Sequence, residues 1–229
     1  MNTKHKKPTL TKKQRHKLRV KQVRRQKIFL TCLFLLIVGC ILLRFSKFSD
    51  RQKETHQINA ACEAYRDEVS SEAAQYDMSD YVDLILAVMM QESSGQGTDP
   101  MQSSEGAYNA RYPQQPNGIT DPSYSISCGI QELKYALDKA GCTGPTDLSK
   151  IRLALQAYNF GADSYFAYLE ENGQTVWTAQ SAQAFAQMAS GNTQRDEDDP
   201  LHDPAGPWDY GDQYYPDHVL RYYHLDNNS

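Results

Sequence analysis

The chain has 229 residues and a formal net charge of −4, and the charge is unevenly divided along it. Residues 1–27 contain twelve Lys and Arg and no acid, whereas residues 50–229 contain all 28 Asp and Glu against ten Lys and Arg. This length corresponds to one ordinary domain with an additional segment. The sequence has no phosphate-binding glycine loop and no dinucleotide fingerprint, and its six His form no pair at metal-ligand spacing, so we expect no cofactor and no metal site.

The basic arm, residues 1–27, runs directly into an apolar stretch, 28–43, which favours a membrane role for the arm over binding to nucleic acid. Sixteen apolar residues are slightly short of the about 20 needed to span a bilayer, and Lys27 and Arg44 can extend to the interface to make up the difference. The sequence therefore predicts a transmembrane signal anchor over residues 28–45. The positive charges before it place the arm in the cytoplasm and the C-terminal domain outside the cell.

The apolar segment has a second interpretation. Residues 37–40, Ile-Val-Gly-Cys, resemble a lipobox in which Cys40 would be acylated. Cys40 is followed by Ile-Leu-Leu, where lipoproteins usually turn polar, so an uncleaved anchor is favoured and a lipoprotein is the alternative. Residues 46–57 are polar without a periodic apolar pattern, and we interpret them as a tether to a domain over residues 58–229.

The pattern of this outer domain is helical, with almost no strand-like alternation. Helices are expected at about 58–76, 79–94, 129–141, 147–160, 178–190 and 216–224. Residues 96–122 are rich in Gly, Pro, Asn and Ser and too long for a plain connector, so they predict a structured loop at an active site. One helical stripe should belong to the core: Leu148, Ile151, Leu155 and Tyr158. The sequence thus predicts an all-α domain.

Glu92 occupies an unusual position in the expected helix 79–94, which we read as capped by Ser79. Apolar residues stand seven, four and three positions before it: Ile85, Val88 and Met89. The carboxylate should therefore lie on the apolar face, in the last turn, because Ser-Ser-Gly ends the helix. Burial favours the protonated form of a carboxyl group, which is the form that a general acid needs. The alternative is a Glu that rotates outward into water at a frayed helix end.

Three segments follow one another in a characteristic order: Gln-Glu-Ser at 91–93, Ser-Cys-Gly-Ile-Gln at 127–131 and Ala-Tyr-Asn-Phe-Gly at 157–161. Together they resemble the signature motifs of lysozyme-like lytic transglycosylases and goose-type lysozymes. The resemblance is strongest to the muramidase domain of CwlT-type wall hydrolases from conjugative elements, and it extends over residues 58–225, including Tyr-Gly-Asp at 210–212. It implies a lysozyme-like fold and cleavage of peptidoglycan.

The resemblance also implies how the carboxyl groups are used. Glu92 would be the general acid that protonates the leaving oxygen. Asp99 stands where CwlT-type muramidases have their second acid, which would activate a water molecule. A loop Asp that caps the turn before Pro100 is the alternative, and Glu105 is a weaker candidate for the same base. Without a base, the N-acetyl group of the substrate could assist and leave an anhydro end.

Four further positions are expected to bind substrate. By the resemblance, Gln131 would hold the acetamido sugar, while Tyr158 and Asn159 would orient Glu92 and the glycan. Gly129 is expected where the backbone comes close to another group, and we expect this position to lie at the cleft.

Three cysteines lie in the outer domain: Cys62, Cys128 and Cys142. An odd number leaves one thiol over or paired with another chain. Cys128 and Cys142 flank an expected helix of about twelve residues, roughly 18 Å long at 1.5 Å per residue. That length exceeds the ~7 Å limit between the Cα atoms of a disulfide, so we expect no bond between them.

The apolar segment predicts a membrane anchor, and the resemblance implies a muramidase that acts on peptidoglycan glycan strands. From the resemblance alone, it would open the wall locally for conjugative transfer, in contact with channel proteins and not with nucleic acid. CwlT-type hydrolases also carry a peptidase domain, which we do not expect in this chain. The alternatives are a lytic transglycosylase and a non-catalytic peptidoglycan-binding assembly protein with a lysozyme fold.

Overall fold

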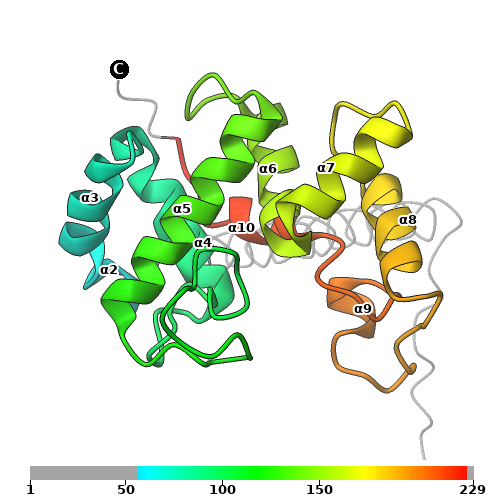
Figure 1. Ribbon diagram of the computed structural model, residues 1–229, viewed down its shortest axis with the longest axis horizontal. Helices are drawn as coiled ribbons and strands as arrows, with labels where there is room; N and C mark the ends of the chain where they lie inside the picture. Colours follow the sequence, from blue (N-terminus) through cyan, green and yellow to red (C-terminus); the bar gives the residue numbers. More distant parts are fainter. Residues whose placement is uncertain (1–55, 226–229) are drawn as a thin grey trace, which may run out of the picture. The chain divides into compact units, whose positions relative to one another are not determined.

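A computed structural model describes residues 56–225, in which the chain folds as a succession of helices (Figure 1). Its longer helices are α3 (Arg66–Gln75), α4 (Val82–Glu92), α5 (Pro122–Ala140), α6 (Leu148–Phe160), α7 (Ala162–Glu171) and α8 (Ala179–Ala189). The shorter ones are α2 (Ala60–Glu63), the 3₁₀ turn η1 (Ser79–Tyr81), α9 (His202–Ala205) and α10 (Tyr215–Leu220). An isolated bridge between Gln194 and Trp208 is the only strand-like pairing in this range. The expectation of an all-α domain is confirmed for residues 56–225.

The predicted membrane anchor over residues 28–45, the basic arm and most of the tether lie outside the described range. Among the helices of residues 56–225, none has the length and apolar character needed to cross a bilayer.

Helix α4 runs through the middle of the core and brings Glu92 to its end. Six consecutive residues, Leu84 to Met89, have no exposed surface, since α3, α10 and α2 all pack around this helix. Burial of this apolar surface supplies much of the driving force that fixes α4 in place. Ser79 is not its cap, contrary to the prediction: it belongs to the preceding turn η1, and Tyr81 occupies the N-cap without a side-chain hydrogen bond.

Helix α5 begins seven residues earlier than the sequence pattern indicated. The Asp121 side chain accepts hydrogen bonds from the backbone N–H groups of Ser123 and Tyr124, and Pro122 occupies the first turn, which is a strong helix start. The small residues at 125–129, which in the sequence are typical of a turn, lie inside this helix. Their small size lets the preceding loop pack directly on the helix. A Cβ atom at Gly129 would stand 2.6 Å from the Cβ atom of Met101, so only glycine permits this approach.

The sequence also missed α7. Helix α6 ends at Phe160, as the predicted range 147–160 has it, but the chain turns at Gly161, with φ 86°, and begins α7 at the next residue. An aromatic cluster then joins α6, α7 and α8: Phe160, Tyr165, Tyr168, Phe185 and Tyr210. Ile151 and Leu155 belong to the core as expected, whereas Leu148 is 43% exposed because it is the first residue of α6.

The three cysteines of the described domain are free thiols. Cys62 and Cys128 are buried, and Cys142 is partly buried. Cys128 lies within α5 and not before it, so the two cysteines do not flank the helix as expected. The predicted absence of a bond between Cys128 and Cys142 is confirmed, since both are free thiols.

Candidate active site

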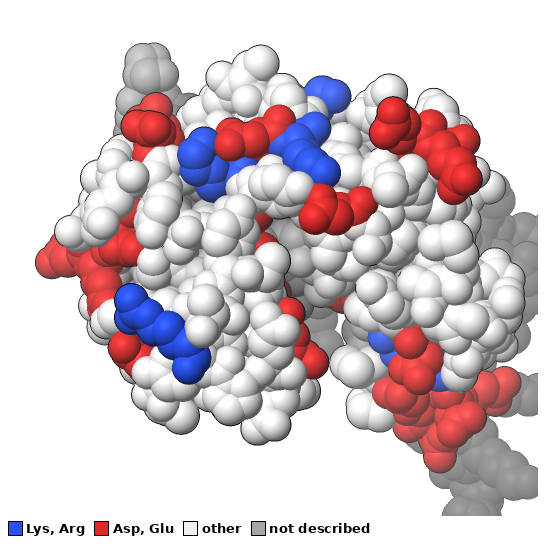
Figure 2. All heavy atoms as spheres, viewed as in Figure 1, with Lys and Arg blue, Asp and Glu red and all other residues white. Residues whose placement is uncertain are grey.

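A cleft of about 780 Å³ opens beside the C-terminal end of α4. Its walls come from Glu92, from the loop around Glu105 and Tyr108, from α5, and from the junction of α6 and α7. The face shown in Figure 2 is hollowed between two lobes, with acidic side chains along the hollow. Glu92, Tyr158 and Asn159, which are far apart in the sequence, all line this cleft.

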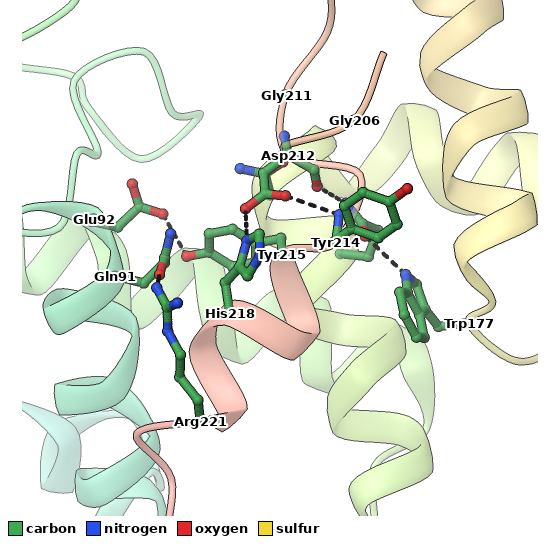
Figure 3. A network of polar contacts seen from close by, with 12 residues as sticks. Gln91, Glu92, Trp177, Gly206, Gly211, Asp212, Tyr214, Tyr215, His218 and Arg221 are labelled. Atoms are coloured by element: carbon green, nitrogen blue, oxygen red, sulfur yellow. Dashed lines mark hydrogen bonds and ion pairs between the residues drawn. The ribbon is translucent and has the colours of Figure 1, made fainter. Parts of the chain in front are cut away.

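Glu92 is the last residue of α4, and its side chain is held from the opposite side by α10. The Tyr215 hydroxyl donates a hydrogen bond of 2.5 Å to Oε1 of Glu92 (Figure 3). Burial raises the pKa of Glu92 to about 7, the Tyr215 hydrogen bond acts in the lowering direction, and the charges of Asp212 and Asp99 raise it further. Near neutral pH the carboxyl group is therefore protonated in a large fraction of molecules.

Tyr215 is a fixed hydrogen-bond donor. Its side chain is buried, and burial together with the nearby Glu92 charge raises the pKa of its phenol well above 10, so the hydroxyl keeps its proton. The ring stacks on that of Tyr158, with centroids 6.2 Å apart and planes 21° from parallel. The Tyr158 hydroxyl donates to the backbone oxygen of Met101 at 2.9 Å, which ties the cleft loop to the same aromatic pair.

Asp212 holds α10 in the position that Tyr215 needs. Its carboxylate accepts from the N–H of Tyr214 at 2.9 Å and lies 2.5 Å from Nδ1 of His218 (Figure 3). Its backbone N–H donates to Oδ1 of Asn159 at 2.7 Å, and its carbonyl accepts from Gln156 at 2.8 Å. These hydrogen bonds join α10 to α6. Helix α10 packs against both α6 and α4 (Figure 1).

Asp99 lies inside the loop and does not line the cleft. Its side chain is 2% exposed, and both carboxylate oxygens are occupied. Oδ1 accepts from the N–H of Ser103 at 3.0 Å and the hydroxyl of Ser125 at 2.6 Å, while Oδ2 accepts from the N–H and hydroxyl of Ser104. Asp99 thus joins this loop to α5, and an activated water molecule would need one of these bonds to open.

Gln131 and Gly129 are placed away from the cleft wall. The Gln131 amide donates to Ser127 on the preceding turn of α5, and Gly129 packs against Met101 in the interior. The next residue, Glu132, lines the cleft instead. One position along a helix rotates the side chain by about 100°, which explains the difference.

Glu105 also lines the cleft and is exposed. Within residues 56–225, no group of three or more His, Cys, Asp or Glu side chains is arranged to hold a metal ion. The residues that sequence reasoning missed are Tyr215, Asp212 and Glu132. Tyr-Gly-Asp at 210–212 was part of the resemblance, but no local pattern assigned a role to Asp212 or connected Tyr215 with Glu92.

A helical domain with a partly protonated Glu at the end of a buried helix, beside a cleft, defines a lysozyme-like protein. The chain belongs to the lysozyme-like family, whose model matches residues 60–223.

Three curated relatives are similar to this chain in sequence. The chain is 36% identical over 173 residues to the bifunctional muramidase/DL-endopeptidase CwlT of Bacillus subtilis strain 168, covering 76% of this chain and 45% of that protein. It is 40% identical over 111 residues to the uncharacterized membrane protein YocA of the same strain, covering 48% and 45%. A pneumococcal vaccine antigen A homolog from Streptococcus pyogenes serotype M1 is 37% identical over 110 residues, covering 48% and 50%.

A solved structure is also similar. It is described as similar to lipoprotein, of the NLP/P60 family, from Staphylococcus aureus subsp. aureus Mu50, and superimposes with a TM-score of 0.61 at 28% identity. The match covers 76% of this chain and 56% of that one. The chain spans about half the length of the curated relatives that it matches.

Proposed function

We propose that this protein cleaves the β-1,4 bond between N-acetylmuramic acid and N-acetylglucosamine in peptidoglycan, with Glu92 as the general acid. The observation that carries the proposal is the Glu92 carboxyl group, which faces a cleft and has a pKa raised to about 7 by burial. Cleavage of a glycosidic bond needs a carboxylic acid that still holds its proton at the working pH.

The hydrogen bond from Tyr215 determines which oxygen of Glu92 reacts. Because Tyr215 donates to Oε1, the carboxyl proton belongs on Oε2, which is left for the glycosidic oxygen. After proton transfer, the same hydrogen bond stabilises the new carboxylate, since a donor favours the charged form. Tyr215 is therefore a positioning residue for the acid.

The second half of the reaction has two possible products. If Asp99 acts as the base, water is added and a reducing muramic acid end results, as for a muramidase. The occupied oxygens of Asp99 favour the second candidate, a lytic transglycosylase, in which the sugar closes internally and leaves an anhydro end lighter by one water. Mass analysis of wall digested with residues 56–229 distinguishes the two, and the absence of any glycan cleavage would leave a peptidoglycan-binding assembly protein.

The cellular setting is part of the same proposal. The charge split and the apolar stretch before residue 46 support a single-pass membrane protein with residues 56–225 outside. There it would open the wall locally for a conjugation channel. Protease added to intact, wall-stripped cells should digest the outer domain and spare the basic arm, and protection of the outer domain would reverse this topology.

A further inference from the structure

Glu132 is a fixed carboxylate on the cleft wall that the cleavage chemistry does not use. Oε1 accepts a hydrogen bond from the backbone N–H of Ala107 at 3.3 Å. Oε2 lies against Gly106, where a Cβ atom would stand only 2.0 Å away, so the loop has no side chain between its backbone and this carboxylate. Glu132 is half-buried and shares the cleft with Glu92 and Tyr158.

Burial raises the pKa of Glu132, and no cation on this wall balances the negative charge that the group carries once it is ionised. None of the residues that line the cleft is Lys or Arg. Among residues 56–225, Glu132 and Glu105 form no ion pair, whereas Asp163 at the rim is neutralised by Lys139 at 2.7 Å. In agreement, the hollow in Figure 2 shows acidic side chains along it, and the basic ones lie on the surrounding surface.

The substrate carries a variable charge next to the sugar ring. Each muramic acid has a lactyl group on C3, whose carboxyl is either a free anion or an amide bonded to a stem peptide. A ring bound in the cleft brings this group close to the walls. We propose that Glu132 is a specificity-determining residue, which makes the cleft select strands whose lactyl carboxyl is amidated and reject strands in which it is free. This inference rests on the proposed cleavage of peptidoglycan.

The size of the effect follows from Coulomb's law. Two like charges several ångströms apart at the partly screened surface of a protein give a preference of about 5- to 50-fold at low salt. Salt weakens it, because the Debye length falls from ~30 Å at 0.01 M to ~8 Å at 0.15 M. A preference based on apolar contacts with the peptide would show no such dependence.

The test compares two peptide-free glycan substrates. Both are prepared by removing the stem peptides, and in one of them the freed lactyl carboxyl is then converted to its methylamide, so the substrates differ in charge but not in peptide. The full-length protein should cleave the methylamide strands about 5- to 50-fold faster, by kcat/KM, at 0.01 M salt. Glu132→Gln keeps the acceptor for Ala107 and should reduce this ratio at least threefold. Glu171→Gln, the same change of charge on an exposed part of α7, should leave it unchanged.

Equal cleavage of the two substrates by the unmodified protein would overturn the inference, and so would a ratio that Glu132→Gln leaves intact. Binding of both strands to the Glu92→Gln variant gives the same comparison without cleavage. Selective binding with no cleavage by the unmodified protein would reject the proposed function alone. Equal binding would reject the role of Glu132 whatever the activity.

Discussion

Tyr215 donates a hydrogen bond to Glu92 across 123 residues of sequence, at 2.5 Å. This bond connects the end of the buried helix α4 with the short helix α10 (Figure 3). It gives the acid a defined orientation and opposes the rise in pKa that burial causes.

Replacing Tyr215 with Phe should shift the alkaline limb of the pH profile upward. Glu92 works as the protonated acid, so activity falls as pH rises through its pKa, and loss of a donor that lowers this pKa moves the fall to higher pH. A hydrogen bond to a charged group contributes about 1.5–3 kcal/mol, which corresponds to a shift of about one unit or more. The measurement is kcat/KM against pH on soluble glycan strands. An unchanged or lowered limb would show that Tyr215 does not act on Glu92.

Asp212→Asn should move the same limb in the opposite direction. The Asp212 charge raises the pKa of Glu92, so its removal lowers the pH at which activity is lost, by a few tenths of a unit for a partly screened charge. The maximal rate should also fall, because Asp212 holds α10 through Tyr214 and His218. The same pH series measures both effects, and an upward shift would contradict the electrostatic assignment.

Glu92→Gln should stabilise the fold at alkaline pH and not at acidic pH. The folded-state pKa of about 7 lies above the ordinary 4.5, so the folded protein binds the proton more tightly and loses stability as pH rises from 4.5 to 7. The neutral amide avoids this loss, which is at most about 3 kcal/mol for a shift of this size in a partly exposed group. Urea unfolding of both proteins at pH 4 and pH 8 gives the comparison. Equal differences at the two pH values would mean that the surroundings of Glu92 do not raise its pKa in the folded protein.

Asp99→Asn should lower the thermal stability as well as the activity. An amide cannot accept all the bonds that Ser103, Ser104 and Ser125 donate, and a buried donor left unpaired costs about 1–3 kcal/mol. The matched variant is Ser125→Ala, which removes one donor and leaves the carboxylate intact. If Asp99 is the base, Asp99→Asn abolishes the reducing ends while Ser125→Ala retains them. Equal losses in the two variants would make Asp99 a structural residue of the loop.

The helical class and the place of Glu92 could be predicted because both depend on local periodicity. Apolar residues at helical spacing predict a buried face, and Ser-Ser-Gly after Glu92 predicts where α4 ends. The start of α5 was missed because small residues inside a helix look like a turn until the loop that packs on them is known. The resemblance assigns the substrate contact to Gln131, whereas Glu132 lines the cleft, because the motif does not give the helical phase relative to the cleft.

The remaining features of the site depend on contacts between distant segments. Tyr215 reaches Glu92 only because Asp212 joins α10 to α6 through Asn159. No local pattern in residues 210–218 predicts that Tyr215 contacts Glu92. The Asp99 carboxylate shows the same limit, since its burial is set by Ser125, 26 residues further along the chain.

The most direct measurement is the release of glycan fragments from purified wall by the Glu92→Gln variant. The amide is nearly isosteric and can still accept the Tyr215 hydrogen bond, but it has no proton to donate to the leaving oxygen. A positioned acid contributes roughly 10²–10⁴-fold, so a correctly folded variant should retain less than about one hundredth of the normal rate. A folded Glu92→Gln variant with more than about a tenth of that rate would contradict the assignment of Glu92 as the acid.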